Sequence, residues 1–158
     1  MSSVPWSTAT AKCIRRAGLA DAESLGTLRR TVGWSAGNVD RQLIDSSALI
    51  FVAELDGRVI GTVTLALTHV DVELADSRHR AFISDLAVGP EWQRRGVGSD
   101  LLAVAEAEAR RRGFEFVTLT VDEHNYSARR LYERCGYRWF KDVNIPWRPG
   151  HALTKRLT

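Results

Sequence analysis

The chain has 158 residues, of which 44% are hydrophobic and 26% are charged, and its formal net charge is +3. This length and composition exclude a disordered or low-complexity protein, and we expect residues 1–158 to form one domain. The modest positive charge suits an anionic cofactor and gives no reason to expect a nucleic-acid partner.

The first ten residues are polar and are predicted to be a loose tail. They lack the apolar core of a secretory leader, and no apolar run approaches the about 20 residues of a membrane span. Two cysteines, Cys13 and Cys135, are present. We therefore expect a cytoplasmic protein with reduced thiols, without a membrane partner and without a metal.

The first third of the chain predicts a strand followed by two helices. Residues 12–16 are the candidate strand. Apolar residues at helical spacing predict a helix over 20–32, which Gly33 and Trp34 end. Asn38 is a candidate N-cap for a second, short helix.

A hairpin and a polar connection follow. Residues 49–55 predict a buried strand, Asp56-Gly57 is a two-residue hairpin signal, and residues 59–67 form its antiparallel partner. Apolar residues then alternate with polar ones, which predicts that the strand continues or that a half-exposed strand follows; they are Val70, Val72 and Leu74.

The stretch from Ile83 to Gly113 predicts a strand, a basic glycine turn and a helix. Residues 83–88 are the strand, which Gly89-Pro90 ends because proline cannot donate to a ladder. The turn reads Q-R-R-G-V-G, and the helix after it runs until Gly113. On this helix Glu106/Arg110 and Glu108/Arg112 are predicted ion pairs.

The last part predicts a strand over 114–121 and a helix from Asn125 to Gly136. Residues 137–140 are strand-like. A loop over 141–151 and a final edge strand over 152–157 complete the predicted order of elements.

The glycine turn at the start of a helix predicts an anion site. The first helical amides have no internal partner, and glycines without Cβ atoms let a phosphate approach the main chain. The alternative is an ordinary turn with a solvated arginine pair. A Walker A string is absent, and a dinucleotide fingerprint would need glycine where Leu101 stands.

Two strings carry a family resemblance: L-A-V-G-P-E-W-Q-R-R-G-V-G at residues 86–98 and N-Y-S-A-R-R-L-Y-E-R-C-G-Y at 125–137. They resemble the pyrophosphate loop and the next helix of the GNAT superfamily of acyl-CoA-dependent N-acetyltransferases. The resemblance is specific over about 82–140. It implies a mixed α/β fold with a twisted, mostly antiparallel sheet of six to seven strands and helices on both faces.

The resemblance also implies acetyl-CoA as the acetyl donor. In the family the central strand and the next one splay apart, and the pantetheine arm lies between them. Its main-chain partners would be Leu86, Ala87 and Val88. The pyrophosphate would meet Gln93, Arg94, Arg95, Gly96, Val97, Gly98 and Ser99. Asn125 would bond the pantetheine arm, and its alternative role is that of a plain N-cap.

For catalysis the resemblance assigns Tyr132 as the acid that protonates the departing thiolate; the alternative is a tyrosine that only packs. An amide near Val88 would polarise the thioester carbonyl. Asp85 is a candidate general base, and a water relay is an equal alternative. The other titratable groups near the site are more typical of surface charges: His69, Asp71, Glu73, His79, Asp122 and His124.

The acceptor pocket of the family is formed by the first helix pair and the late loop. This implies substrate contacts at Trp34, Asp71, Glu73, Trp139 and Trp147, which suit a cationic amine. The basic loop 148–155 would instead favour an anionic acceptor. We expect acetyl transfer to a primary amine of a small molecule by direct attack in a ternary complex. The alternatives are a protein N-terminal or lysine acetyltransferase and a non-catalytic CoA-binding module, and a homodimer is compatible with each.

Overall fold

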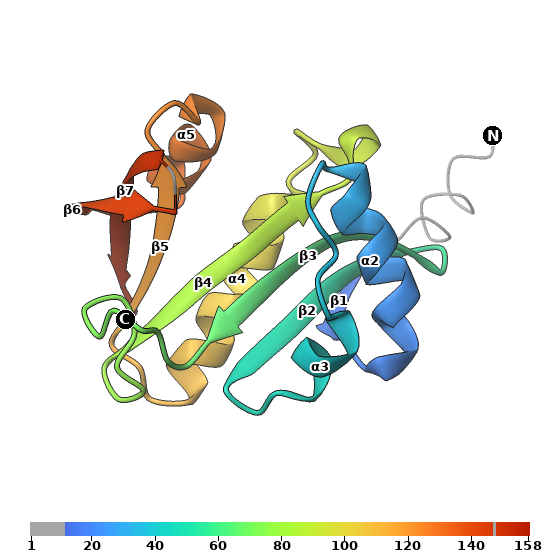
Figure 1. Cartoon of the computed structure of the whole chain (residues 1–158), viewed down its shortest axis with the longest axis horizontal. Coiled ribbons are helices and arrows are strands. Elements are labelled where there is room, and N and C mark those ends of the chain that lie inside the picture. The colour runs from blue at the N-terminus through green and yellow to red at the C-terminus, as the bar shows by residue number, and fades with distance from the viewer. Residues whose placement is uncertain (1–11, 147) are drawn as a thin grey trace. The chain divides into compact units, whose positions relative to one another are not determined.

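The computed structural model describes residues 12–146 and 148–158, and its elements follow the predicted order (Figure 1). The strands are β1 (Lys12–Arg16), β2 (Ala48–Leu55), β3 (Arg58–Ala66), β4 (Arg80–Val88), β5 (Phe116–Asp122), β6 (Arg138–Ile145) and β7 (Arg148–Arg156). The helices are α2 (Ala22–Thr31), α3 (Val39–Ile44), α4 (Val97–Arg111) and α5 (Tyr126–Arg134), with 3-10 turns η1 (Leu19–Asp21) and η2 (Pro90–Trp92). The predicted tail, residues 1–10, lies outside the described residues.

The strands form one sheet in the order β1-β2-β3-β4-β5-β7-β6. β4 and β5 are parallel, whereas β1 with β2, β5 with β7, and β6 with β7 are antiparallel. The parallel ladder covers only three pairs, from Arg80–Phe116 to Phe82–Thr118. The mixed α/β class with a mostly antiparallel sheet is thus confirmed.

Contacts between Cα atoms divide the chain into two units. The first unit comprises Met1–Thr64 and Asp85–Val104, and the second comprises Leu65–Ser84 and Ala105–Thr158. β4 and α4 each contribute one part to either unit. Each unit has its own core.

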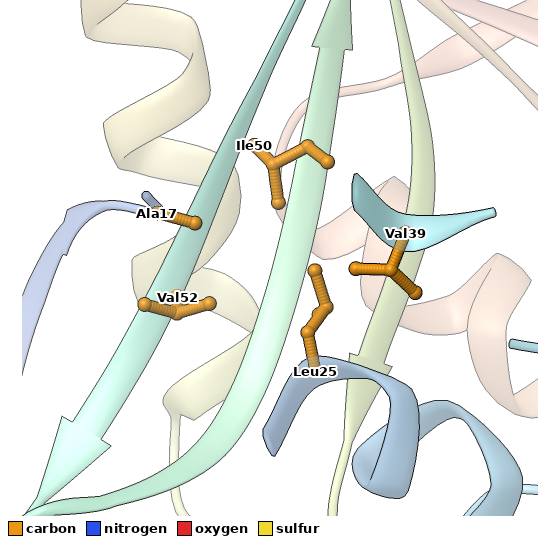
Figure 2. Packing of buried hydrophobic residues seen from close by; sticks show 5 residues of the cluster. All are labelled: Ala17, Leu25, Val39, Ile50 and Val52. Atoms are coloured by element: carbon orange, nitrogen blue, oxygen red, sulfur yellow. The ribbon is translucent and has the colours of Figure 1, made fainter. Parts of the chain in front are cut away.

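The core of the first unit lies where α2 and α3 cover β2. Leu25 of α2, Val39 of α3, and Ile50 and Val52 of β2 are all buried in one cluster with Ala17. Figure 2 shows Leu25 pointing from its helix toward Ile50 and Val39. The side chains of Leu25 and Val52 are 0% exposed, so burial of each contributes about 1.5–3 kcal/mol to folding.

The hairpin and the caps of the first unit form as predicted. Asp56 and Gly57 have φ of 49° and 78°, the two left-handed positions of a type I′ turn, so β2 and β3 are joined by two residues. The Asn38 side chain accepts from the amide of Arg41 at 3.1 Å and caps α3.

Gly61 of β3 sets how closely α4 approaches. A Cβ at this position would lie 2.9 Å from Leu101 Cδ1, 3.1 Å from Val97 Cγ1 and 3.2 Å from the Ala87 carbonyl oxygen. Leu101 and Val97 are buried. The missing side chain therefore lets the first turns of α4 lie directly on the sheet.

The second unit is built around β7, which pairs with β5 on one side and β6 on the other. Gly150 of β7 is required by this arrangement, because a Cβ there would lie 2.4 Å from Ile145 Cδ1 and 2.6 Å from the Val121 carbonyl oxygen. Its small core contains Leu74, Ala75, Phe82 and Ala152.

The prediction of a strand over residues 70–74 is wrong, because local bonds close a turn there. Asp71 Oδ1 accepts from the amide of Glu73 at 3.0 Å, and the Asp71 carbonyl accepts from the amide of Leu74 at 2.9 Å. Aspartate side chains compete with strand ladders in this way. The alternation misled the prediction, since Val70 is 99% exposed whereas Leu74 is buried.

Two predictions about the C-terminal part are also wrong. Most of the expected loop over 141–151 belongs to the β6–β7 hairpin, and Pro149 pairs with Asn144 near the start of β7. The last strand is not an edge strand, since β7 lies between β5 and β6. A proline is tolerated close to a strand's first residue, where a missing N–H costs little.

Within the described residues, none of the helices is both long and apolar enough to span a membrane.

Candidate functional site

The predicted anion loop lies between η2 and α4, in the first unit. Arg94 and Gly96 have left-handed backbones, with φ of 63° and 84°. A backbone that changes hand in this way orients main-chain N–H groups into a concave turn, and this turn leads directly into α4. α4 has 15 residues, so its dipole adds partial positive charge at the same end. The loop can therefore bind a phosphate through its main chain.

Side-chain contacts hold the loop against the end of β4. Gln93 Nε2 donates to the Val88 carbonyl at 3.0 Å, and the Arg95 guanidinium lies 5.3 Å from the centroid of the Trp92 ring. The Gly96 carbonyl accepts from the amide of Asp100 at 3.0 Å. Gln93 thus ties the loop to the strand, a role that its predicted cofactor contact did not include.

The segment of β4 in the first unit begins with a backbone irregularity at Asp85. This residue has a φ of 53°, a conformation that aspartate tolerates better than most residues. Its side chain is exposed and makes no hydrogen bond or ion pair within the described part of the chain. Leu86 and Val88 are half-buried and Ala87 is buried. Asp85 therefore differs from the other candidate bases in having no partner there.

The predicted residues of α5 belong to the second unit. Asn125 caps the helix, since its Oδ1 accepts from the amide of Ala128 at 3.2 Å. Its side-chain amide nitrogen has no partner among residues 12–146 and 148–158. The cap therefore leaves two N–H donors for a ligand, so the two predicted roles are compatible.

Tyr132 is half-buried on α5, with its ring edge against Tyr137 at a centroid distance of 6.1 Å. Burial, with a smaller contribution from Cys135, raises the pKa of Tyr132 to about 12. The phenol therefore stays protonated at neutral pH and can act as a donor but not as a base. Its hydroxyl has no hydrogen-bond partner among the described side chains and main-chain groups.

The predicted acceptor residues of the second unit are already ion-paired. Lys141 Nζ donates to Asp71 Oδ2 at 2.8 Å and to Glu73 Oε1 at 2.6 Å. The hydrogen bond from Lys141 lowers the pKa of Asp71 below its ordinary value. A cationic acceptor would have to compete with this lysine. Trp34 lies in the first unit, in the turn after α2, with 38% of its surface exposed, whereas Trp147 lies outside the described residues.

The remaining candidate bases are engaged in local bonds. The His69 ring accepts from the amide of Asp71 at 2.9 Å. Asp122 accepts from the amide of His124 at 2.8 Å, and this bond lowers the pKa of Asp122. A carboxylate with a lowered pKa is a weaker base, which makes Asp71 and Asp122 poorer candidates.

Two further groups were not identified from the sequence, a buried cluster around Glu106 and the buried Arg29. Glu106 was expected to pair with Arg110, but it is buried and bonds Tyr137 and Lys155, whereas the predicted Glu108–Arg112 pair is present at 2.7 Å. The sequence feature that could have indicated the burial of Glu106 is its position within the apolar stripe of the helix.

Buried Arg29 is the second group. Its Nη1 donates to the Ala36 carbonyl at 3.2 Å and to Gln42 Oε1 at 2.5 Å, while its Nε and Nη2 are buried without a partner. No sequence signal marked Arg29, since it lies among ordinary polar helix residues.

Across the part of the chain that the structure describes, no group of three or more histidine, cysteine, aspartate or glutamate side chains could hold a metal ion. The predicted residues divide between the two units. The first unit holds Asp85 to Val88, Gln93 to Ser99 and Trp34, and the second holds Asn125, Tyr132, Asp71 and Glu73.

A family model and three relatives found by sequence comparison all point to N-acetyltransferases. The family model described as "Acetyltransferase (GNAT) family" matches residues 19–137. An uncharacterised N-acetyltransferase of Bacillus subtilis, YhfO, is 33% identical over 61% of this chain and 62% of its own length. An aminoglycoside N(6')-acetyltransferase of Stenotrophomonas maltophilia is 29% identical over 82% of this chain and 88% of its own. An aminoalkylphosphonate N-acetyltransferase of Salmonella typhimurium is 33% identical over 61% of this chain and 60% of its own.

Solved structures share the fold at low sequence identity. An acetyltransferase assigned to the GNAT family from Desulfovibrio desulfuricans has a TM-score of 0.80 and 20% identity, over 94% of this chain and 100% of its own. The PaiA N-acetyltransferase of Thermoplasma acidophilum, in complex with coenzyme A, has a TM-score of 0.77 and 18% identity, over 92% of this chain and 99% of its own.

Proposed function

Because the chain belongs to the GNAT family of acyl-CoA-dependent acetyltransferases, we propose that it moves the acetyl group of acetyl-CoA to a primary amine of a small molecule. Two relatives are named for small amine acceptors, an aminoglycoside and an aminoalkylphosphonate. A structural neighbour was solved with coenzyme A. The alignments with YhfO and with the aminoalkylphosphonate enzyme each span about three fifths of the relative. The small-molecule amine acceptor is therefore proposed for this chain and not inferred from family membership.

The observation that carries this proposal is the loop before α4. Its left-handed residues Arg94 and Gly96 and the helix start offer main-chain donors to a pyrophosphate. Exposed Arg94 can add a charge-assisted bond, since it has no ion pair within the described part of the chain. Within the first unit, the main chain of Leu86, Ala87 and Val88 would then pair with the pantetheine arm.

The chemistry requires a neutral amine and a good leaving group. A free alkylamine has a pKa of about 10.4, so only about one molecule in a thousand is neutral at pH 7. The lone pair of the neutral amine attacks the thioester carbonyl, and the carbon–sulfur bond breaks as the thiolate leaves. The amine loses one proton and the thiolate gains one, so the reaction needs a base and an acid but no redox partner.

Tyr132 is the proposed acid. Its pKa of about 12 keeps the hydroxyl protonated, so it donates a hydrogen bond to the sulfur as negative charge develops there. A thiol with a pKa of about 8.5 is a stronger acid than this phenol, so transfer of the Tyr132 proton to the sulfur is unfavourable by itself. It is completed because solvent returns a proton to Tyr132 as the thiol forms.

Asp85 is the proposed base, directly or through a bound water. Its carboxylate is exposed and has no ion pair among the described residues, whereas bonds already lower the pKa of Asp71 and Asp122. The amide near Val88 is the proposed donor to the thioester carbonyl oxygen.

A protein N-terminus is the second candidate acceptor, because a neighbouring structure is the ribosomal-protein-S18-alanine N-acetyltransferase of Escherichia coli, at 19% identity and a TM-score of 0.77.

Ion pairing of Asp71 and Glu73 with Lys141 leaves this acidic pair less available to a cationic acceptor. An acceptor that carries an anionic group could instead meet Lys141.

The test begins with a thermal-shift measurement. At a hundredfold excess over Kd, acetyl-CoA should stabilise the native state by about 2.7 kcal/mol, which raises Tm by roughly 5–10 °C. ATP is the control for a general polyphosphate effect. A shift with ATP and none with millimolar acetyl-CoA would refute the proposal.

A thiol-release assay then compares kanamycin, 2-aminoethylphosphonate and a peptide with an N-terminal alanine. Turnover with either small amine supports the proposal, and turnover with the peptide alone replaces it with the second candidate. Binding of acetyl-CoA without turnover on any amine would leave a CoA-binding module.

A further inference from the structure

Within the second unit a buried polar cluster joins α4, the turn that follows α5, and β7. Tyr137 Oη donates to Glu106 Oε2 at 2.8 Å, and Lys155 Nζ donates to Glu106 Oε1 at 2.8 Å. Tyr137 is 2% exposed and Glu106 is 6% exposed. Both carboxylate oxygens therefore have a partner, as a buried charge requires.

Lys155 closes the cluster from the β7 side. Its ammonium lies 5.7 Å from the centroid of the Tyr137 ring. Gly136, with φ of 97°, has no Cβ, and one would lie 3.4 Å from Lys155 Cε. The left-handed glycine thus follows the end of α5 and turns the chain toward Tyr137, with the lysine stem within van der Waals distance of this position.

Tyr137 contacts Tyr132 in two ways. The amide of Tyr137 donates to the Tyr132 carbonyl at 3.0 Å, and the two rings meet edge to face with an interplanar angle of 63°. Tyr137 is held in turn by the carboxylate of Glu106. The orientation of the Tyr132 ring therefore depends on a chain of contacts that ends at an ion pair between α4 and β7.

We propose that Glu106, Tyr137 and Lys155 are positioning residues that hold Tyr132 in the orientation in which its hydroxyl reaches the departing sulfur. This inference rests on the proposed role of Tyr132. A phenylalanine at 137 would fill the same space, so packing alone gives no reason for the hydroxyl. The bond to Glu106 fixes where the Tyr137 ring lies, and the Tyr132 ring rests against it.

The experiment is a double-mutant cycle on Tyr137→Phe and Tyr132→Phe. Thiol release from acetyl-CoA is measured with the acceptor that gives the highest turnover among kanamycin, 2-aminoethylphosphonate and the alanine peptide. We expect Tyr137→Phe to lower kcat about tenfold, with the KM for acetyl-CoA changed less than twofold. In the Tyr132→Phe background the same substitution should leave kcat unchanged, because there is no longer a hydroxyl to position.

Tyr126→Phe is the matched control. Tyr126 also lies on α5 but is 59% exposed and outside the cluster, so its loss of a hydroxyl should change neither kcat nor KM. If Tyr137→Phe does not fold, Glu106→Met replaces it in the cycle. Methionine is close to glutamate in size but has no carboxylate to accept from Tyr137 or to pair with Lys155, so the same fall in kcat is expected, again only while the Tyr132 hydroxyl is present.

The outcomes separate this inference from the proposed function. Wild-type kcat in Tyr137→Phe, or an equal loss in both backgrounds, overturns the positioning role while Tyr132 remains the acid. Wild-type kcat in Tyr132→Phe overturns the acid role and the positioning role with it. A raised KM for acetyl-CoA at unchanged kcat makes the cluster part of the binding site and also overturns the inference.

Discussion

In the first unit the candidate anion site is made mainly of main-chain groups, whereas in the second unit the surroundings of Tyr132 are made of side chains. The loop needs only left-handed backbones at Arg94 and Gly96 and a helix behind them. The tyrosine needs Tyr137, Glu106 and Lys155, which come from three places in the chain. A main-chain site leaves a short local string in the sequence, and a side-chain site of this kind does not. The two kinds of site should also respond differently to mutation.

The largest expected effect comes from Gly96→Asp. The new carboxylate would face the space that the pyrophosphate needs, and the left-handed backbone would be strained. We expect the Kd for acetyl-CoA, measured by isothermal titration, to rise at least about a hundredfold, or ~2.7 kcal/mol.

Gly113→Asp is the matched control for Gly96→Asp. Gly113 also has a left-handed backbone, with φ of 91° and open space at its Cβ, but it lies at the other end of α4. It should lose stability of the same order, about 1–2 kcal/mol, with unchanged affinity. Equal affinities in the two variants would show that the loop does not hold the phosphates.

Tyr132→Phe tests the side-chain site. We expect turnover to fall by about a hundredfold, the lower end of general acid catalysis, since water can partly replace the phenol. The Kd for acetyl-CoA should change little because the ring remains. A loss of affinity as large as the loss of turnover would make Tyr132 a binding residue.

The pH dependence of kcat sharpens the role of Tyr132. The pKa of about 12 means that the phenol holds its proton throughout pH 6–10, so its ionisation should not lower kcat in this range. Above the pKa the donor is lost, so any fall due to Tyr132 belongs at still higher pH. A basic limb near pH 10 that disappears in Tyr132→Phe would contradict the raised pKa.

A smaller effect is expected at Asp85, where main chain and side chain contribute together. Asp85→Asn keeps a residue type that tolerates φ of 53° and removes the base, so turnover should fall about tenfold to a hundredfold with Tm unchanged. Asp85→Ala should in addition lower stability by about 1 kcal/mol, because alanine is strained in this conformation. Thermal melts and thiol release on both variants separate the two effects. Wild-type turnover in Asp85→Asn would assign the base role to water.

The smallest effect is expected from Lys141→Met. Removing the lysine frees Asp71 and Glu73, and the pKa of Asp71 should rise toward its ordinary value while the carboxylate stays ionised at pH 7. If these carboxylates line the acceptor pocket, KM should fall a few fold for kanamycin and rise for 2-aminoethylphosphonate. Arg129→Met, which removes a weaker surface pair on α5, should leave both values unchanged.

The order of elements could be predicted from the sequence because each depends on local chemistry. Asp56-Gly57 needs left-handed residues, and Asn38 needs only an amide three residues later. The errors arose where a local turn overrides the apolar alternation or where a strand depends on distant partners. Val70 and Val72 alternate like strand residues, yet Asp71 closes a turn that Lys141 holds from β6. The predicted loop after Pro146 is instead the start of strand β7, because β7 pairs with β5 on one side and with β6 on the other.

The same distinction applies to the candidate site. The turn at Gln93 to Gly98 could be identified from its glycines and arginines alone. Glu106 could not, because its partners Tyr137 and Lys155 lie 31 and 49 residues away. Its position in the apolar stripe of α4 indicates burial, but no local pattern identifies its distant partners, so a rule based on neighbours one helical turn apart assigned it to Arg110.

The close packing at Gly61 has a consequence for how this protein can evolve. A methyl group there would press on Val97 and Leu101, the first turns of the helix that follows the anion loop. A variant with alanine at this site should be tolerated only after one of those two side chains has become smaller. The order in which such substitutions arise would then matter. Gly61, which contacts no ligand itself, would thereby limit which sequences of mutations can change the affinity of the loop before α4 for its ligand.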